Sequence, residues 1–222
     1  MKRRFVAIII PVISLLTACA RSNIRSDIKE FIASFSIDLA VENYQVASYS
    51  REDISIENEV TSKIVTTMSI DRKNKDNLAY DYQTITYENN DVKNQEHRYI
   101  EKNNEKYFYY TEEGNYEQTS EQVDSLINGF FYTSSKEGIY TGGMFMGDAF
   151  REILPNIQDL VTIDSENKLL VYSYVNVMNE KNKEVRIEQT VTLDEYGMLV
   201  KEDMKKTSDL GVYETHIEVK KQ

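Results

Sequence analysis

Apolar residues follow a helical period near the start of the chain and a two-residue period along most of the rest. Between residues 24 and 40 they recur at spacings of three and four, which predicts one amphipathic helix. These positions are Ile24, Ile28, Phe31, Ile32, Phe35 and Leu39. From residue 63 onward, apolar and polar residues alternate in short runs between polar turns. This alternation predicts successive antiparallel hairpins.

The predicted strands fall into two groups with a helical segment between them. The strands cover residues 63–71, 78–87, 96–101 and 107–111, and then 169–178, 185–193, 198–206 and 212–219. Thr119 and Gln122 form the pattern of a capping box, which predicts a helix from that point. A second helical run follows Gly142-Gly143, and we expect Pro155 to end it. The strand that begins at Leu169 is apolar on both faces, so we expect it to be central in the sheet.

The order of helix, strands, helical insert and strands resembles the superfamily of the LolA-type lipoprotein carriers and the mycobacterial LppX and LprG lipoproteins. The turn Leu193-Asp194-Glu195-Tyr196-Gly197-Met198-Leu199 is similar to their late hairpin. The resemblance lies in element order and covers most of residues 24–220. It implies an α+β fold in one domain, residues 26–222, with one highly curved antiparallel sheet that forms a half-open barrel. An N-terminal helix and a helical insert at 119–155 would cover its concave side, and the family binds acyl chains or lipid-linked molecules.

The first residues have the layout of an export signal. Three basic residues at 2–4 precede a mainly apolar run over 5–16. This run is shorter than the roughly 20 residues of a membrane-spanning helix. Pro11 lies inside it and further disfavours a stable span.

Leu16-Thr17-Ala18-Cys19 resembles the lipobox that the lipoprotein signal peptidase reads. This resemblance implies cleavage before Cys19 and a diacylglyceryl group on its sulfur. We therefore expect residues 1–18 to be a signal peptide and 19–25 a lipidated tether. Lipid would hold the protein on the outer leaflet of the cell membrane, or on an outer membrane in a cell that has two. The alternative is an ordinary export signal with a chance cysteine.

The charge of the chain limits its partners. The net charge is −11, and loss of residues 1–18 removes three basic residues and no acid, which leaves about −14. Such a chain lacks the clustered positive charge of a nucleic-acid-binding protein. It is also poorly suited to electrostatic docking on anionic lipid. Cys19 is the only cysteine, so no disulfide forms within the chain.

The sequence contains no recognisable catalytic or metal-binding motif. His97 and His216, the only histidines, lie in separate predicted strands, and neither a zinc-protease motif nor a nucleophile elbow is present. We therefore predict no enzyme activity, no cofactor and no metal. Metal-free catalysis by two carboxylates stays open as an alternative.

Apolar side chains in the insert and two tyrosines are candidates for ligand binding. The candidates are Met144, Phe145, Met146, Phe150, Phe130, Phe131, Tyr172 and Tyr174. Flexible methionines after glycines would suit a mobile lid over an apolar ligand, although the same residues could pack a core. We therefore consider two hypotheses for the function. In the first, the protein is anchored to the membrane and binds a lipid or another apolar ligand. In the second, it is a surface lipoprotein with a filled core that binds a protein partner in the envelope.

Overall fold

The computed structural model describes residues 24–74, 79–131, 143–180 and 183–222. The predicted signal peptide, its lipobox and Cys19 lie outside these ranges. So do residues 132–142 of the predicted insert.

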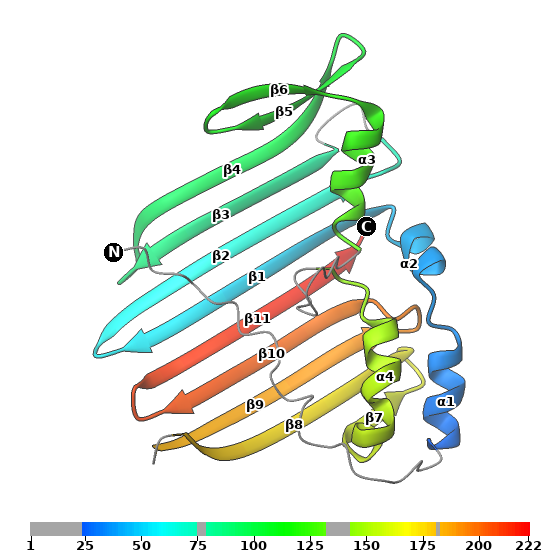
Figure 1. The fold of residues 1–222 in the computed structure, drawn as a ribbon, viewed down its shortest axis with the longest axis vertical. Coiled ribbons are helices and arrows are strands. Elements are labelled where there is room, and N and C mark those ends of the chain that lie inside the picture. The colour runs from blue at the N-terminus through cyan, green and yellow to red at the C-terminus, as the bar shows by residue number, and fades with distance from the viewer. Residues whose placement is uncertain (1–23, 75–78, 132–142, 181–182) are drawn as a thin grey trace.

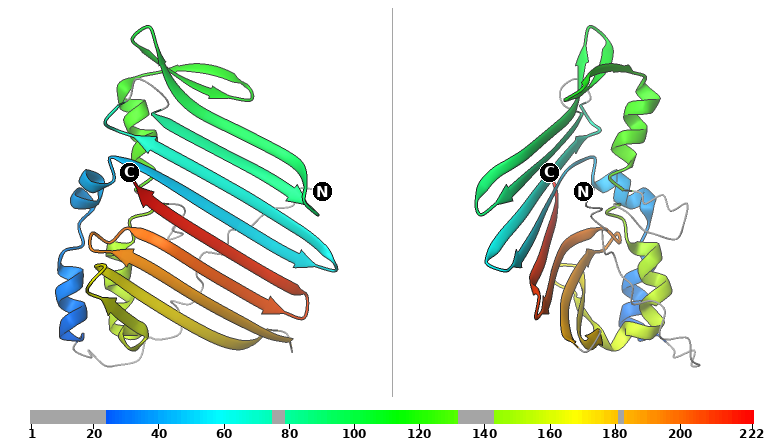
Figure 2. Two further views of the ribbon diagram at one scale, coloured as in Figure 1. Left: turned by 180° about the vertical axis from the view of Figure 1, so that it is seen from behind. Right: turned by 60° about the vertical axis from the view of Figure 1, so that its left-hand side comes forward.

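In the described residues, eleven strands form one antiparallel sheet that does not close into a barrel (Figure 1). The strands are β1 (Val46–Glu57), β2 (Val60–Asp71), β3 (Tyr80–Glu88), β4 (Asp91–Asn103), β5 (Lys106–Thr111), β6 (Gly114–Gln118), β7 (Val161–Asp164), β8 (Leu169–Glu180), β9 (Lys183–Asp194), β10 (Leu199–Ser208) and β11 (Gly211–Lys221). Their order is β6-β5-β4-β3-β2-β1-β11-β10-β9-β8-β7. The pairing of β1 with β11 joins the two predicted strand groups into one curved sheet (Figure 2). The predicted α+β class with a curved antiparallel sheet is confirmed.

Two-residue turns close three of the hairpins. In Asn58-Glu59, Asn89-Asn90 and Asn104-Glu105, both residues have φ between 50° and 70°. Such a pair of left-handed residues matches the twist of the flanking strands, and asparagine adopts this conformation more readily than most residues. The asparagines therefore set the hairpin registers.

The N-terminal helical segment is two helices, α1 (Ser26–Ala33) and α2 (Ile37–Asn43), so the predicted single helix over 24–40 is wrong. Ser36 caps α2 because its hydroxyl accepts a hydrogen bond from the Leu39 amide at 3.4 Å. The Ser36 amide donates to the Tyr196 carbonyl at 3.1 Å. The chain therefore bends at Ser36 and docks on the turn between β9 and β10.

The insert forms α3 (Ser120–Asn128), α4 (Gly147–Ile157) and the short 3-10 helix η1 (Gln158–Leu160). Both hydrogen bonds of the capping box between Thr119 and Gln122 are present, as predicted. The prediction that the helix ends at Pro155 is wrong, because α4 continues to Ile157. Pro155 lacks an amide donor and its ring crowds the preceding turn, but the helix continues for only two residues beyond it.

The strand that begins at Leu169 is β8, and the prediction that it is central is wrong. Its outer neighbour β7 pairs with it only from Leu169 to Tyr172. Val175 and Val177 are 59% and 50% exposed. The second apolar face of this strand is therefore largely a solvent-exposed surface.

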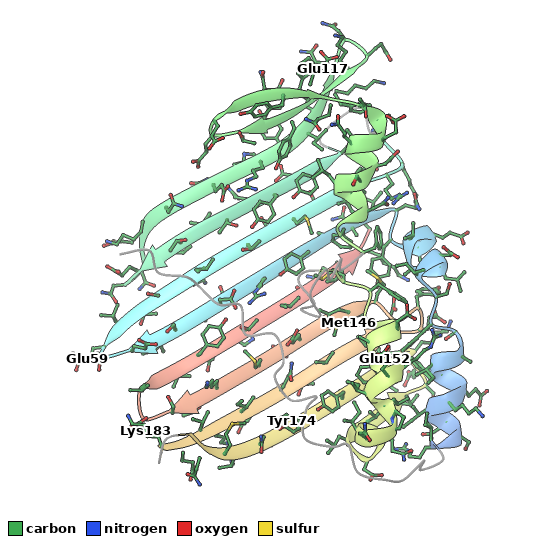
Figure 3. The ribbon with its side chains drawn as sticks, in the orientation of Figure 1. Glu59, Glu117, Met146, Glu152, Tyr174 and Lys183 are labelled. Atoms are coloured by element: carbon green, nitrogen blue, oxygen red, sulfur yellow. The ribbon has the colours of Figure 1, made fainter. Side chains whose placement is uncertain are left out.

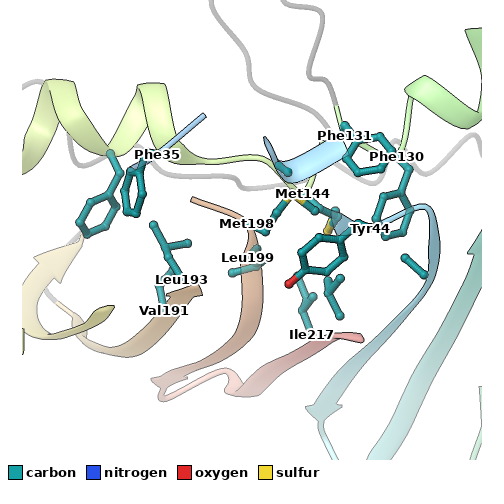
Figure 4. Close-up of a cluster of buried hydrophobic side chains, with 14 of the residues drawn as sticks. Phe35, Tyr44, Phe130, Phe131, Met144, Val191, Leu193, Met198, Leu199 and Ile217 are labelled. Carbon is teal, nitrogen blue, oxygen red and sulfur yellow. The ribbon is translucent and has the colours of Figure 1, made fainter. Parts of the chain in front are cut away.

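The helices gather over one end of the strands and cover that part of the concave face (Figures 1 and 2). We call this region the packed end. It includes the fully buried Leu170, Leu193, Met198, Phe130 and Phe131 (Figure 4). Burial of each such side chain stabilises the fold by about 1.5–3 kcal/mol.

Candidate ligand-binding site

The strand registers align residues into rows across the concave face. Side chains two residues apart on a strand share a face, so the face that buries Leu170 and Leu193 continues along each strand beyond the helices. One row runs through Tyr172, Val191, Glu202, Ile217, Arg51 and Thr66, and the next through Tyr174, Gln189, Met204, Thr215, Asp53 and Ile64. We call these two rows, together with Tyr49 and Tyr213 beside them, the open face, because no described helix lies across most of it in Figure 1. Val191, Thr215 and Ile217 within it are nevertheless buried, at 5%, 3% and 7% exposure.

An arginine–aspartate pair lies in the middle of the open face. Arg51 donates from Nε and Nη2 to the two carboxylate oxygens of Asp53, at 2.7 and 3.0 Å. The hydroxyls of Tyr213 and Thr215 donate to Asp53 Oδ1 at 2.8 and 2.7 Å. Burial alone would raise the pKa of Asp53, but these hydrogen bonds and the Arg51 charge outweigh it and lower the pKa. Asp53 is therefore held ionised.

A second carboxylate, Glu202, lies in the row of Arg51. Burial raises the pKa of Glu202, while the hydrogen bond from Gln189 and the charge of Arg51 oppose this shift. Gln189 Nε2 donates to Glu202 Oε1 at 2.8 Å. Burial also raises the pKa of Tyr213, and that of Tyr49 to about 12, so both hydroxyls stay protonated near neutral pH. The open face thus offers one guanidinium, two carboxyl groups and neutral hydroxyls.

Aromatic rings connect this polar centre to the packed end. Tyr172 contacts Phe150 of α4 edge to face, with ring centroids 6.0 Å apart, and stacks with Tyr174 at 6.3 Å. Tyr174 lies farther along β8, away from the helices (Figure 3). A tyrosine ring has an apolar body and a polar tip. Rings beside a charged pair therefore suit an amphipathic ligand.

Four of the predicted ligand-binding residues lie in the core of the packed end. Phe130 and Phe131 have no exposed surface, and Met144 and Phe150 are 5% and 2% exposed (Figure 4). A side chain without accessible surface adjoins no space that a water molecule can enter. The interior around Phe130 and Phe131 is therefore filled with protein atoms.

The predicted lid segment, Met144-Phe145-Met146, is hydrogen-bonded to the chain that follows α3 and to the turn between β9 and β10. The amides of Met144 and Phe145 donate to the carbonyls of Phe130 and Phe131 at 2.9 and 3.1 Å. The Met146 amide donates to the Gly197 carbonyl at 2.9 Å, and the Leu199 amide donates to the Met144 carbonyl at 2.7 Å. Phe145 and Met146 are partly buried against the core. This placement gives the segment a packing role, and its opening as a lid stays a prediction.

Tyr172 and Tyr174 are the two predicted residues that the structure brings to the open face. The sequence reasoning missed Arg51, Asp53 and Glu202. A usable signal was the Arg-x-Asp spacing, because residues two apart on a strand share a face.

The two histidines lie on the opposite, convex face. His97 contacts Asp81 at 3.2 Å and His216 contacts Asp203 at 2.8 Å, and both imidazoles are exposed. Among the residues that the structure describes, no group of three or more His, Cys, Asp or Glu side chains is placed to hold a metal ion. In the same ranges, none of the helices has the length and apolarity to cross a bilayer.

No family model matches the chain, and no curated protein matches it. Among solved structures, it is similar to a β-barrel-like protein of the domain of unknown function DUF1849 from Brucella abortus. The identity is 7%, the match covers 80% of this chain and 98% of the other, and the TM-score is 0.27. A DUF1329 family protein from Desulfovibrio piger is 10% identical over 86% of this chain and 89% of the other, with a TM-score of 0.18. At these TM-scores, neither likeness bears on the function.

Proposed function

We propose that this protein is a lipid-anchored, non-catalytic binding protein of the bacterial cell envelope, and that its open face binds a lipid or another amphipathic ligand. One observation carries this proposal. The concave face continues beyond the described helices as a surface of tyrosines and methionine around the Arg51–Asp53 pair.

The two parts of such a ligand would contact different groups. Tyrosine rings and the flexible Met204 suit an acyl chain of irregular shape. Arg51, Glu202 and the hydroxyl of Tyr213 suit a head group that both donates and accepts hydrogen bonds. Because the packed end is filled around Phe130 and Phe131, the ligand would lie along the open face rather than beneath the insert.

The expected anchor would hold one side of the sheet near the bilayer. The Arg25 amide donates to the Gln158 side chain at 2.9 Å, and Arg25 Nη1 donates to the Val161 carbonyl at 3.0 Å. These bonds fix the first described residues beside β7. Five residues lie between Cys19 and Arg25, so the six steps from one to the other span at most about 20 Å. A lipid on Cys19 would therefore keep the β7 side of the sheet close to the membrane.

Native mass spectrometry of the full chain, purified from bacterial membranes with its co-purifying lipids, tests ligand binding. We expect a bound mass that organic extraction removes. Tyr174→Ser should lose most of it, whereas Tyr87→Ser, the same change on the convex face, should retain it. Absence of any bound mass from the wild type, or equal loss from both variants, would contradict the proposal.

The anchor has a separate test. Cys19→Ser should abolish processing before residue 19 and release the domain from sedimented membranes, because two acyl chains at that sulfur supply the anchoring energy. Unchanged processing and sedimentation would refute lipidation while leaving the question of ligand binding intact.

A second candidate function is a surface lipoprotein that binds a protein partner. The filled interior of the packed end favours this candidate, because no apolar cavity adjoins Phe130 or Phe131. Cross-linking in cells followed by purification should then return one defined partner. Recovery of lipid without a partner would reject this candidate.

A further inference from the structure

Within the described residues, the sheet has two long strand edges without a neighbouring strand. β7 pairs with β8 only over Leu169–Tyr172, so residues 173–180 have no partner on their outer side. At the other end of the sheet, β5 pairs with β4 only over Tyr99–Asn103, so residues 91–98 are open in the same way. Unpaired backbone groups at an edge can bind another strand.

The two edges differ in their protection against such pairing. The β4 edge carries Asp91, Lys93, Glu96 and Arg98, and charged edge residues disfavour addition of a strand. The β8 edge, residues 173–179, reads Ser-Tyr-Val-Asn-Val-Met-Asn and contains no charged side chain. Its Val175 and Val177 are the exposed valines noted above. The β8 edge is therefore open and uncharged in a strongly acidic protein.

We propose that residues 173–179 of β8 pair antiparallel with the same residues of a second copy, about a two-fold axis at Asn176. This register places Val175 of one copy opposite Val177 of the other, and Tyr174 opposite Met178. Pairing stops before Tyr172, where β7 already occupies the edge, and before the strand ends at Glu180. The two sheets would then form one larger sheet, and the concave faces of the two copies would lie on the same side of it.

The register favours a second copy as the occupant, because antiparallel pairing about Asn176 sets Val175 against Val177 and Tyr174 against Met178, so the edge is complementary to itself. The net charge of −11 on each copy opposes the contact, but the facing segments contain no charges that would add to this repulsion. Pairing of β8 with the charged β4 edge is disfavoured, so the contact closes as a dimer rather than growing into a fibre.

The dimer should be weak in solution. Seven residues of strand pairing bury less than the roughly 1,200 Å² of a standard interface. Anchoring two copies in one membrane would raise their effective concentration. This point rests on the proposed anchor, whereas the pairing itself does not.

Disulfide trapping in membranes of cells that express the full chain tests the register. Asn176→Cys places a cysteine on the proposed axis, opposite its own copy. Asn94→Cys is the matched control on the open β4 edge, and the wild type reports any cross-linking through Cys19. Under mild oxidation, we expect a disulfide-linked dimer for Asn176→Cys well above both controls. No dimer, dimer equal to that of Asn94→Cys, or linkage only to a different protein would overturn the proposal.

A second variant keeps the test independent of chance collisions between thiols. Val175→Lys combined with Asn176→Cys should reduce the trapped dimer about tenfold, because both copies then bring a lysine to the paired edge. Val92→Lys is the matched control, since Val92 lies on the β4 edge and is 58% exposed. Combined with Asn176→Cys, it should leave the dimer yield unchanged. Equal yields from the two combinations would contradict edge pairing even if a dimer forms.

Discussion

Along β8 and β9, the concave face changes from a packed end to an open face within four residues. Leu170 faces Leu193 beneath the helices, and both are fully buried. Four residues farther along β8, Tyr174 faces Gln189, whose amide binds Glu202. The comparison separates two tasks within one sheet: the packed end supplies folding energy, and the open face keeps polar groups available for a ligand.

The largest effect is expected at the packed end. Leu193→Ala should lower the free energy of unfolding by about 3 kcal/mol, because it removes buried methyl groups and leaves a cavity. Chemical denaturation measures this loss. Leu210→Ala in the β10–β11 turn is the control, since Leu210 is 65% exposed. If the two variants were equally stable, the packed end would not carry the stability of the fold.

A slightly smaller effect is expected at Gly197, in the turn that joins the packed end to α2 and the insert. Its φ is +87°, and a Cβ atom there would lie 3.0 Å from the Gly147 Cα. Gly197→Ala should destabilise the fold by about 2 kcal/mol, because alanine is strained in that conformation and the neighbouring backbone must move. Thermal unfolding measures the loss, with Gly114→Ala as a control for the strained φ without crowding. Equal losses would show that the close approach to Gly147 is unimportant.

The smallest effect is expected on the open face, and it should depend on pH. The pKa of Glu202 is raised in the folded protein, so the fold binds that proton more tightly than the unfolded chain does. The cost of ionising Glu202 is absent below the ordinary carboxyl pKa and fully present above the raised one. Glu202→Gln should therefore be neutral in acid and stabilising by about 1 kcal/mol above the raised pKa. Denaturation at several pH values checks the sign, and destabilisation that grows with pH would contradict it.

The sequence predicted β2 to β5 and β8 to β11 and missed β1, β6 and β7. β2 and β9 alternate apolar and polar residues, and both were found. β1 was missed because its concave residues include Arg51 and Asp53, so neither face of the strand is uniformly apolar. The same property explains why Arg51 and Asp53 were missed, since these charged residues remove the hydrophobic pattern of β1. Glu202 lies in β10, which was predicted, and it was missed because its place beside Arg51 depends on the pairing of β10 and β1 with β11.

Long-range pairing was the other information that the sequence lacked. Residues 169–178 are apolar on both faces, and this pattern does not distinguish a central strand from an edge strand with an exposed apolar surface. Whether β8 is covered or exposed on its outer edge depends on β7, which has only four residues. A strand of that length is too short to give a recognisable hydrophobic periodicity in the sequence. The break between α1 and α2 likewise depends on the contact of Ser36 with Tyr196, 160 residues away in the sequence.

The position of a bound ligand tests the central claim most directly. A crystal structure of the protein purified with its co-purifying lipids should show density along the open face, with an acyl chain against Tyr174 and a head group within hydrogen-bonding distance of Arg51. Density for a ligand among Phe130, Phe131 and Leu193, or an open face occupied only by water in protein that carries bound lipid, would contradict the account.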